Sequence, residues 1–292
     1  MRKDSFHVHH PVDLEEALKK WNESTFDPVF LAGGTDWVLK WRQGEIDPLV
    51  VIDISHVKEL KGIREEEDRI VLGAATTFDE LSLHPLLNKY AMVLVQAAKS
   101  VGSTQIRNMA TIGGNVANAA PCADSVTALI ALDAKACIIN QEKRIREAFI
   151  KDLVQDKHQD RLREKELIIE IFFEKEAVMT FNGFAKIGDR STVTISKLNA
   201  GIALKCENGL IKKAQIALGA LAPKAFVAEG LSHALVGKRM DGRLISFLQE
   251  EAVTIVDQSI KGRKSHPYKR EAVKGLMDDL IANLVEVKAD EI

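Results

Sequence analysis

The sequence predicts an α+β protein of two domains, with a change of pattern near residue 175. Before that point, short apolar runs alternate with helical patterns. After it, two β-like runs flank Asn208-Gly209, the strongest short signal for a hairpin, and helical patterns follow. We therefore expect a first domain over residues 1–175. A second domain over residues 178–285 is expected to pack an antiparallel hairpin sheet against helices.

The first domain is expected to begin with a helix whose N-cap is Asp13, supported by Glu16 three residues later. The continuous apolar run at 48–53 is typical of a strand buried on both faces. A second capping box predicts a short helix from Thr77, and a longer helix is expected over residues 90–101. Further strands are predicted over residues 29–32, 70–74, 134–139 and 167–173. The charge-dense stretch 151–165 has no apolar period and indicates a solvated loop.

The second domain is expected to contain two strands and three helices. The strands are predicted over residues 200–206 and 210–218, on either side of the Asn-Gly turn. The helices are predicted over residues 231–235, 243–256 and 270–287.

Composition limits the classes of function. The chain has 292 residues, 46% of them hydrophobic, and a formal net charge of -2, so it has material for a core and no sign of a nucleic-acid partner. No apolar run approaches the roughly 20 residues of a membrane helix, and the start has no signal-peptide core. Three scattered cysteines, Cys122, Cys137 and Cys206, fit a reducing compartment and make no cluster site. These features predict a cytoplasmic protein without membrane contact.

Familiar catalytic signatures are missing from the sequence. It has no Ser-His-Asp order, no nucleophile elbow and no metal motif. The histidines at positions 7, 9 and 10 have no Cys, Asp or Glu partner close by, so we predict no metal site there. A cofactor that itself carries the chemistry would explain this absence of catalytic side chains.

Two glycine pairs are the most informative feature. Gly33-Gly34 follows the apolar run 29–32, and Gly113-Gly114 lies in the small-residue stretch 110–124. Each pair has a threonine and an Asn or Asp beside it. Glycine permits positive φ or a close approach of ligand to backbone, and exposed N–H groups can cradle an anion. Neither pair has the G-x-G-x-x-G spacing or the lysine of a P-loop, so a Rossmann site is disfavoured.

The repeated pattern suggests one ligand held from two sides. We expect the two glycine turns to close on a ligand with a central pyrophosphate. Trp37, Val101 and Ile112 are candidates for the apolar walls around a ring. Arg107, between the two turns, fits either a phosphate or carboxylate contact or a structural ion pair.

Several ordered motifs resemble the flavin (medium) subunit of the xanthine dehydrogenase family of molybdenum hydroxylases, which is similar also to that of carbon monoxide dehydrogenase. The motifs are LAGGTD at 31–36, QIRN at 105–108, TIGGN at 111–115 and NAAPCAD at 118–124. Weaker resemblance at 166–171, 184–190 and 265–270 extends it over nearly the whole chain.

The resemblance implies a fold and a set of cofactor contacts. It implies a PCMH-type FAD-binding domain of two α/β subdomains and a C-terminal domain of the molybdenum hydroxylase flavoprotein type, with FAD held between them. The FAD-binding positions that it implies are Leu31, Ala32, Gly33, Gly34, Thr35, Asp36, Trp37, Val38, Val101, Thr111, Ile112, Gly113, Gly114, Asn115, Asp124, Ile168 and Lys186. It implies no catalytic side chain and no metal ligand on this chain.

Two of these positions have a second interpretation. Lys186 is either a cation beside the isoalloxazine, where it would stabilise reduced anionic flavin, or a structural surface lysine. Asp124 is a flavin contact, the N-cap of the helix that follows it, or both.

The resemblance also implies a function and partners. In that family, electrons leave the substrate at molybdenum on a large molybdopterin-binding subunit and pass through two [2Fe–2S] clusters of a small subunit. They then reach FAD on the medium subunit and leave to NAD or another acceptor. The chain is thus expected to be the FAD-dependent oxidoreductase subunit of a heterotrimer that oxidises CH or CH2 groups. The alternatives are a stand-alone flavin oxidase or diaphorase without molybdenum partners, and a nucleotide-sensing module.

Overall fold

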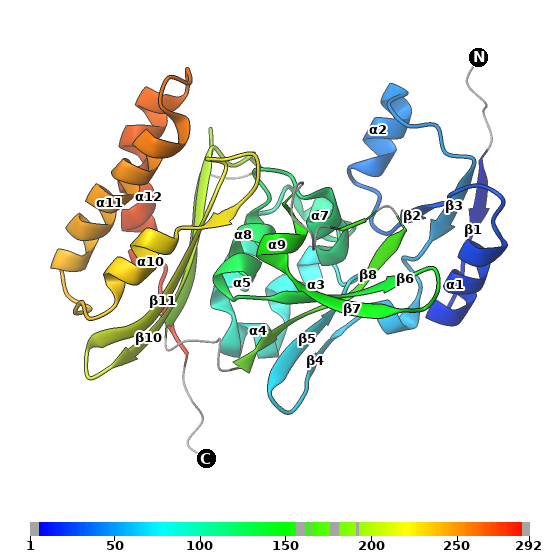
Figure 1. Cartoon of the computed structure of the whole chain (residues 1–292), viewed down its shortest axis with the longest axis horizontal. Helices are drawn as coiled ribbons and strands as arrows, with labels where there is room; N and C mark the ends of the chain where they lie inside the picture. The colour runs from blue at the N-terminus through cyan, green and yellow to red at the C-terminus, as the bar shows by residue number, and fades with distance from the viewer. Residues whose placement is uncertain (1–5, 156–161, 164, 176–180, 191–192, 288–292) are drawn as a thin grey trace.

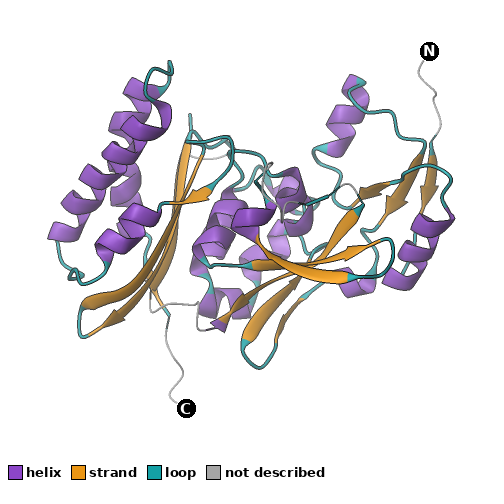
Figure 2. Ribbon diagram, in the orientation of Figure 1, coloured by secondary structure: helices purple, strands orange, loops and turns teal. Residues whose placement is uncertain are grey.

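Three sheets and the helices around them make up the structure, a computed structural model that describes residues 6–155, 162–163, 165–175, 181–190 and 193–287. Figure 1 shows the sheets in sequence along the long axis, and Figure 2 shows helices between them and on the outer side of the last sheet. These sheets and helices confirm the predicted α+β class, including the antiparallel C-terminal sheet packed against helices. The predicted domain boundary falls at residues 176–180, which lie outside the described residues.

The first subdomain is a small parallel α/β unit. Its sheet has the order β1-β3-β2, with both pairings parallel. Its elements are β1 (His7–His9), α1 (Leu14–Glu23), β2 (Val29–Leu31), α2 (Trp37–Gln43) and β3 (Val50–Asp53). Val51 and Ile52 point to opposite faces of the central strand and both are buried, which confirms the predicted double-faced burial. The predicted cap of α1 is also present, since the Asp13 carboxylate accepts from the Glu16 N–H.

The second subdomain has an antiparallel sheet of order β4-β5-β8-β6-β7, so only the first of the two subdomains has a parallel sheet. Its strands are β4 (Ile63–Glu65), β5 (Arg69–Gly73), β6 (Lys135–Asn140), β7 (Ile145–Phe149) and β8 (Glu166–Glu174). Its helical segments are η1 (Lys58–Leu60), α3 (Phe78–Leu83), α4 (Pro85–Tyr90), α5 (Met92–Ser100), α6 (Thr104–Arg107), α7 (Ile112–Asn118), α8 (Asp124–Ala131) and α9 (Ile150–Leu153). The predicted capping box of α3 is present.

The stretch 151–165, predicted as a loop, differs at its start. Its first residues continue α9, where Ile150 and Leu153 are buried, so a short apolar turn precedes the polar segment. Residues 156–161 and 164 of this stretch lie outside the described residues.

The C-terminal sheet has the order β12-β11-β10-β9-β13 and is antiparallel throughout. Its strands are β9 (Phe181–Ile187), β10 (Leu198–Glu207), β11 (Leu210–Gly219), β12 (Phe226–Val227) and β13 (Val285–Glu286). The predicted hairpin is confirmed, with Asn208 at φ 53° and Gly209 at φ 73°. Helices α10 (Glu229–Leu235) and α12 (His266–Ala282) pack on this sheet, and α11 (Arg243–Ile260) packs against α12 (Figure 1).

The last predicted helix, over residues 270–287, was wrong at both ends. It begins earlier, at His266, where Pro267 suits a first turn because its missing N–H has no helical partner to lose. It ends at Ala282 because Asn283 leaves the helix and its side-chain amide donates to the Phe184 carbonyl. The following residues form β13 and pair with β9.

A buried polar seam joins the second subdomain to the C-terminal sheet. Helices α5 and α8 pack on β9, β10 and β11. In the seam the fully buried Asn182 accepts from the Val93 N–H at 2.7 Å and donates to the Tyr90 carbonyl at 3.2 Å. The Thr127 hydroxyl donates to the Asn199 amide oxygen at 2.8 Å. These bonds satisfy buried polar groups and fix how the sheet sits on the helices.

Replacing Asn182 should therefore destabilise the fold. Asn182→Ala leaves the Val93 N–H and the Tyr90 carbonyl without their partner, and we expect a loss of about 2–4 kcal/mol in the free energy of unfolding. Urea denaturation followed by circular dichroism measures it. Asn88→Ala removes an exposed asparagine bond within α4 and should cost less than about 0.5 kcal/mol. Equal losses in the two variants would contradict the structural role of the seam.

Candidate functional site

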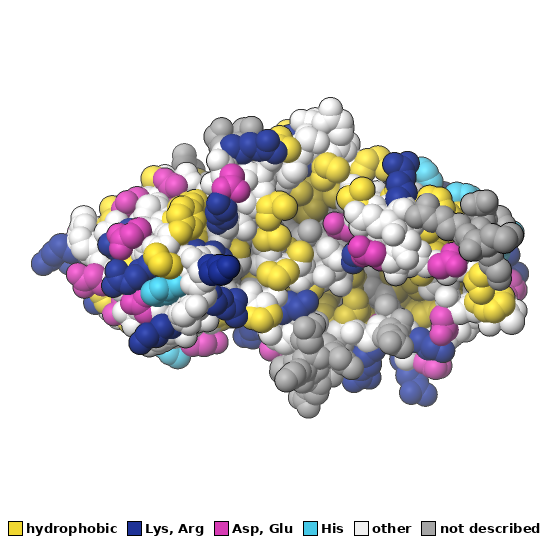
Figure 3. All heavy atoms as spheres, turned by 90° about the horizontal axis from the view of Figure 1, so that it is seen from above, with side chains coloured by type: hydrophobic (Ala, Val, Ile, Leu, Met, Phe, Trp, Pro, Cys, Tyr) yellow, Lys and Arg dark blue, Asp and Glu magenta, His cyan; other side chains and the backbone are white. Residues whose placement is uncertain are grey.

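One cavity of about 550 Å³ brings together residues from all three parts of the fold. Both glycine pairs contribute to its lining, together with the residues just after α5, the α8 residue Asp124, the β9 residue Lys186 and residues 194–196. Figure 3, which looks down on the molecule from above Figure 1, shows hydrophobic side chains gathered along the middle of this face. The expectation that the two glycine segments share one ligand space agrees with this arrangement.

The first glycine pair is a loop between β2 and α2. A Cβ on Gly33 would lie 1.9 Å from the Met109 carbonyl oxygen, so the backbone itself excludes any side chain there. Gly34 has φ 71°, a conformation that favours glycine. Position 33 therefore needs glycine because the two glycine segments touch there, and position 34 favours glycine because of the backbone conformation of the turn.

The main-chain donors of this cavity-lining loop are unpaired within the described part of the chain. Among the described residues, no acceptor bonds the N–H groups of Gly33, Gly34, Thr35 or Asp36. The carbonyls of Gly34 and Asp36 are used, because they accept from Val38 and Lys40 in the first turn of α2. Consecutive free N–H groups form a concave donor surface that suits phosphate oxygens.

The second glycine pair differs from the expected open cradle. Gly113-Gly114 lies in the first turn of α7, with Thr111 as its N-cap. The Ile112 N–H donates to the Thr76 carbonyl at 3.0 Å and the Gly113 N–H to the Ala74 carbonyl at 2.8 Å. The Gly114 N–H donates to the Thr111 hydroxyl oxygen at 3.3 Å. These N–H groups are thus satisfied within the protein.

The two glycines of this pair have separate reasons to be glycine. A Cβ on Gly113 would lie 2.6 Å from the Ala74 Cβ, so α7 could not pack so closely on the strand end of β5. A Cβ on Gly114 would meet only the Thr111 hydroxyl oxygen, at 3.0 Å, and this residue is exposed and lines the cavity. Gly113 is therefore a packing residue and Gly114 a cavity residue.

Most of the residues predicted from sequence to bind a cofactor line this cavity. They are Leu31, Ala32, Gly33, Gly34, Thr35, Asp36, Trp37, Val101, Thr111, Gly114, Asn115, Asp124 and Lys186. Val38, Ile112, Gly113 and Ile168 do not line it. Ile112 was expected as a ring wall, but it is fully buried in the core of the second subdomain, as is nearly all of Ile168 on the central strand β8.

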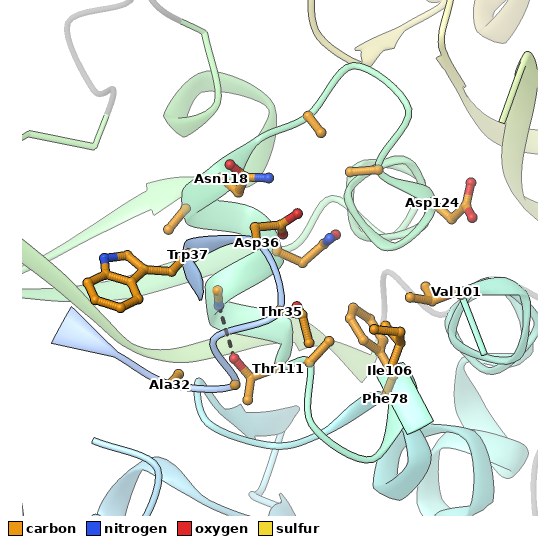
Figure 4. A pocket seen from close by; sticks show the side chains of 18 of the residues that line it. Ala32, Thr35, Asp36, Trp37, Phe78, Val101, Ile106, Thr111, Asn118 and Asp124 are labelled. Atoms are coloured by element: carbon orange, nitrogen blue, oxygen red, sulfur yellow. Dashed lines mark hydrogen bonds between the residues drawn. The ribbon is translucent and has the colours of Figure 1, made fainter. Parts of the chain in front are cut away.

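The apolar part of the lining lies mainly away from Trp37. Figure 4 shows Phe78, Val101 and Ile106 grouped at one end and the Trp37 indole at the other. That indole stacks on Trp41, with ring centroids 6.3 Å apart, and meets Phe6 edge-on. The Trp37 Nε1–H is buried and has no partner among the described residues. This donor is a further polar group that is unpaired in the described chain, on the residue that follows the first loop.

Asp124 and Lys186 form a buried ion pair, with 2.6 Å between the Asp124 Oδ2 and the Lys186 Nζ. Lys186 Nζ also donates to the Ser100 carbonyl, and the Ser100 hydroxyl donates to Asp124 Oδ2. The other carboxylate oxygen accepts from Ser196 at 2.5 Å and from Asn199 at 2.7 Å. Asp124 therefore joins α5 and α8 to the C-terminal domain at the cavity wall.

Two interpretations of these residues need correction. Asp124 is not the N-cap of α8: the cap is Ala123, and the Asp124 side chain turns to the network instead. Lys186 is not a surface lysine, because its side chain is only 11% exposed. Its charge faces Asp124, so the cavity meets a neutralised pair rather than an isolated cation.

Some lining residues were missing from the predicted set. They are Phe30, Lys40, Phe78, Gly102, Ile106, Ala110, Ala117, Asn118, Ala120, Cys122, Ala123, Thr194, Ile195 and Ser196. Lys40 Nζ lies 3.4 Å from Asn118 Oδ1 and supplies a cation close to the open loop. One turn of helix separates Lys40 from Asp36, and that spacing is the signal that could have identified it. The segment 194–196 carries no such signal, because only the tertiary fold brings it to the cavity.

The N-terminal histidines contact each other and a neighbouring carboxylate. His7 and His9 meet edge-on, with ring centroids 4.5 Å apart, and His10 Nδ1 lies 3.2 Å from the Asp53 carboxylate. In the part of the chain that the structure describes, no three potential ligands are grouped to hold a metal ion. Nor does any described helix have both the length and the apolar character needed to cross a bilayer.

The lining fits an elongated cofactor with a phosphate middle and an aromatic ring. The open N–H groups and Lys40 offer donors for phosphate oxygens, while Phe78, Val101 and Ile106 offer an apolar end. The site thus has the chemistry of a nucleotide cofactor site built without a Rossmann fingerprint.

Comparison with known families identifies the cofactor. Residues 4–173 match the family described as the FAD binding domain in molybdopterin dehydrogenase, and residues 184–284 match the CO dehydrogenase flavoprotein C-terminal domain. The chain therefore belongs to the FAD-binding medium subunits of the xanthine dehydrogenase and CO dehydrogenase family. FAD is its cofactor, and it is an oxidoreductase subunit of the molybdenum hydroxylase family.

Individual relatives align over almost the whole chain. The nicotinate dehydrogenase FAD-subunit of Eubacterium barkeri is 29% identical, over 94% of this chain and 95% of its own. The carbon monoxide dehydrogenase medium chain of Hydrogenophaga pseudoflava is 27% identical, over 90% and 91%. A solved structure of carbon monoxide dehydrogenase from that organism, lacking the Mo-pyranopterin moiety, aligns with a TM-score of 0.84 at 25% identity, over 97% and 98%.

The two kinds of glycine should respond differently to substitution. Gly33→Ala forces the backbone away from Met109 and should cost about 1–3 kcal/mol or more of unfolding free energy. Gly114→Ala adds a methyl group whose one close contact is the Thr111 hydroxyl oxygen at 3.0 Å, a side-chain atom that can shift, so its stability should stay within about 1 kcal/mol of the unchanged protein. Urea titration of the FAD-free proteins measures both. A Gly33→Ala protein as stable as Gly114→Ala would refute the packing role of Gly33.

Proposed function

We propose that this chain is the FAD-binding electron-transfer subunit of a molybdenum hydroxylase complex. Its partners in this proposal are a molybdopterin-binding large subunit and a small subunit with [2Fe–2S] clusters. Bound FAD supplies an acceptor that takes electrons one at a time and releases them in pairs to NAD or another acceptor. Full-length similarity to FAD subunits and medium chains of such dehydrogenases supports this proposal.

The single observation that carries the proposal is the common lining of one cavity by both glycine segments. In this assignment the N–H groups of Gly33–Asp36 and the Lys40 ammonium hold the pyrophosphate, with Thr111, Gly114 and Asn115 on the opposite wall. The Thr111 hydroxyl oxygen uses a lone pair to accept from the Gly114 N–H, and its proton is therefore still available to donate to the ligand.

The remaining residues orient the ring. Val101, Phe78 and Ile106 line the apolar end, where they exclude water from one side of the isoalloxazine. The Asp124–Lys186 pair lies at the border of the cavity and fixes the C-terminal domain against it. The chain's own part in the reaction is thus to bind, orient and shield the cofactor, while substrate chemistry lies on another subunit.

FAD binding can be tested by a cysteine footprint. Burial, and to a smaller degree the charge of Asp124, raises the pKa of the Cys122 thiol, so little thiolate is present at pH 8 and alkylation is slow. Its rate should rise with pH as thiolate forms. Cys122 lines the cavity, so bound FAD should cover its thiol and block the alkylating reagent. We expect FAD to slow alkylation of Cys122 at least about fivefold at any pH. Mass spectrometry of iodoacetamide adducts measures the rate.

Cys206 provides the internal control. Burial raises the pKa of the Cys206 thiol as well, but Cys206 lies on β10 and does not line the cavity, so FAD should leave its alkylation rate unchanged.

Purified protein should be yellow and release one FAD per chain on denaturation. A colourless protein that takes up no added FAD, with Cys122 unprotected, would overturn the proposal. Co-purification of two further subunits distinguishes the complex from a stand-alone flavin oxidoreductase.

A further inference from the structure

A second cavity of about 500 Å³ adjoins the first and has a different chemistry. The two share Gly102, Lys186 and Thr194 as lining residues, so they meet at a wall near the ends of α5 and β9. The second cavity lies on the α6 side of that wall. We call it the basic pocket.

Four cationic side chains line the basic pocket: Lys99, Arg107, Lys186 and Arg190. No carboxylate is among its described lining residues. Apart from glycines and Val193, the rest of the lining is hydroxyl or amide: Ser100, Ser103, Thr104, Gln105 and Thr194. The lining therefore has many hydrogen-bond donors, no acidic group among the described residues and little apolar surface. Such a lining suits a multiply charged anion better than an aromatic ring.

Three of these cations have no acidic partner in the described chain. Arg107 is half-buried, and its guanidinium donates to the carbonyls of Val101 and Gly102 and to the Thr104 hydroxyl. Arg190 donates to the Val193 carbonyl. Lys99 is exposed, and no ion pair with a described residue involves it.

The nearby carboxylates are already used. Asp124 is paired with Lys186 inside the wall, and Asp189, next to Arg190, is paired with Lys197. The positive charges of Lys99, Arg107 and Arg190 therefore line the basic pocket without a carboxylate among the described residues to neutralise them. Guanidinium groups that bond only to neutral carbonyls and hydroxyls keep their full charge available to a ligand.

We propose that the basic pocket binds the phosphate group of a small molecule, at a site separate from the FAD cavity. Arg107 and Arg190 supply planar donors to the phosphate oxygens, and Lys99 adds a point charge at the rim. The same chemistry serves inorganic phosphate, pyrophosphate or the diphosphate of a nucleotide. A nucleotide held here has its other end free to approach the shared wall with the cofactor cavity.

Calorimetric titration of the FAD-loaded protein tests the proposal. Sodium pyrophosphate, inorganic phosphate and NAD are titrated separately, and NAD again in the presence of pyrophosphate. Pyrophosphate should bind, and the double variant Arg107→Gln, Arg190→Gln should weaken it at least about tenfold, because two charge-assisted contacts are lost. Lys212→Gln, on the exposed side of β11, is the matched control and should leave the Kd unchanged.

Further measurements distinguish a loss of ligand binding from a loss of folding or of FAD. Arg190→Gln alone changes an exposed residue and should weaken pyrophosphate about threefold to tenfold without altering the thermal unfolding curve. The flavin absorbance of each sample tests the proposed function independently. NAD binding that pyrophosphate abolishes assigns the ligand as a nucleotide, and binding of the inorganic anions alone assigns it as free phosphate.

Three results would overturn the phosphate site. The first is an FAD-loaded protein that binds none of the three probes. The second is equal affinity for pyrophosphate in the unchanged protein and the double variant. The third is loss of FAD from the double variant while it remains folded, since that would make the basic pocket part of the cofactor site.

Discussion

The approach of the Gly33 backbone to the Met109 carbonyl is the contact on which the site depends. It brings a loop of the parallel subdomain against the segment that leads into α7. No side chain lies between the two backbones, so both glycine segments border one cavity. The first subdomain is further fixed because its core continues into β6 and β8 through Ile139, Leu167 and Ile169. The cofactor cavity is thus formed by packing between the two subdomains and not by either glycine motif alone.

Charge is distributed around that space in an ordered way. The open N–H groups and Lys40 lie toward the first subdomain, whereas the Asp124–Lys186 pair closes the wall toward the C-terminal domain. A buried pair contributes little net stability by itself, but loss of either partner would leave the other charge uncompensated. Because Asp124 also bonds Ser196 and Asn199, this wall links cofactor space to the position of the C-terminal sheet.

The sequence was most informative where structure is local. The caps at Asp13 and Thr77 and the turn at Asn208-Gly209 depend on a few neighbouring residues, and all three were predicted. The role of Gly113 depends on Ala74, and the partner of Lys186 is Asp124, so neither could be found from spacing. Most of the residues that the motifs predicted do line the cavity, but the segment 194–196 was not among them, because only tertiary packing brings it there. Nor could they show that the N–H groups of α7 are already bonded.

Hydrogen exchange of the main chain tests the central claim, that the first glycine loop supplies the open donors and the second is already satisfied. In FAD-free protein the amides of Gly33, Gly34, Thr35 and Asp36 should exchange fast, and those of Ile112 and Gly113 slowly. Addition of FAD should slow the first group by at least about tenfold and leave the second nearly unchanged. Protection that appears only in the second group, or in neither, would contradict the account.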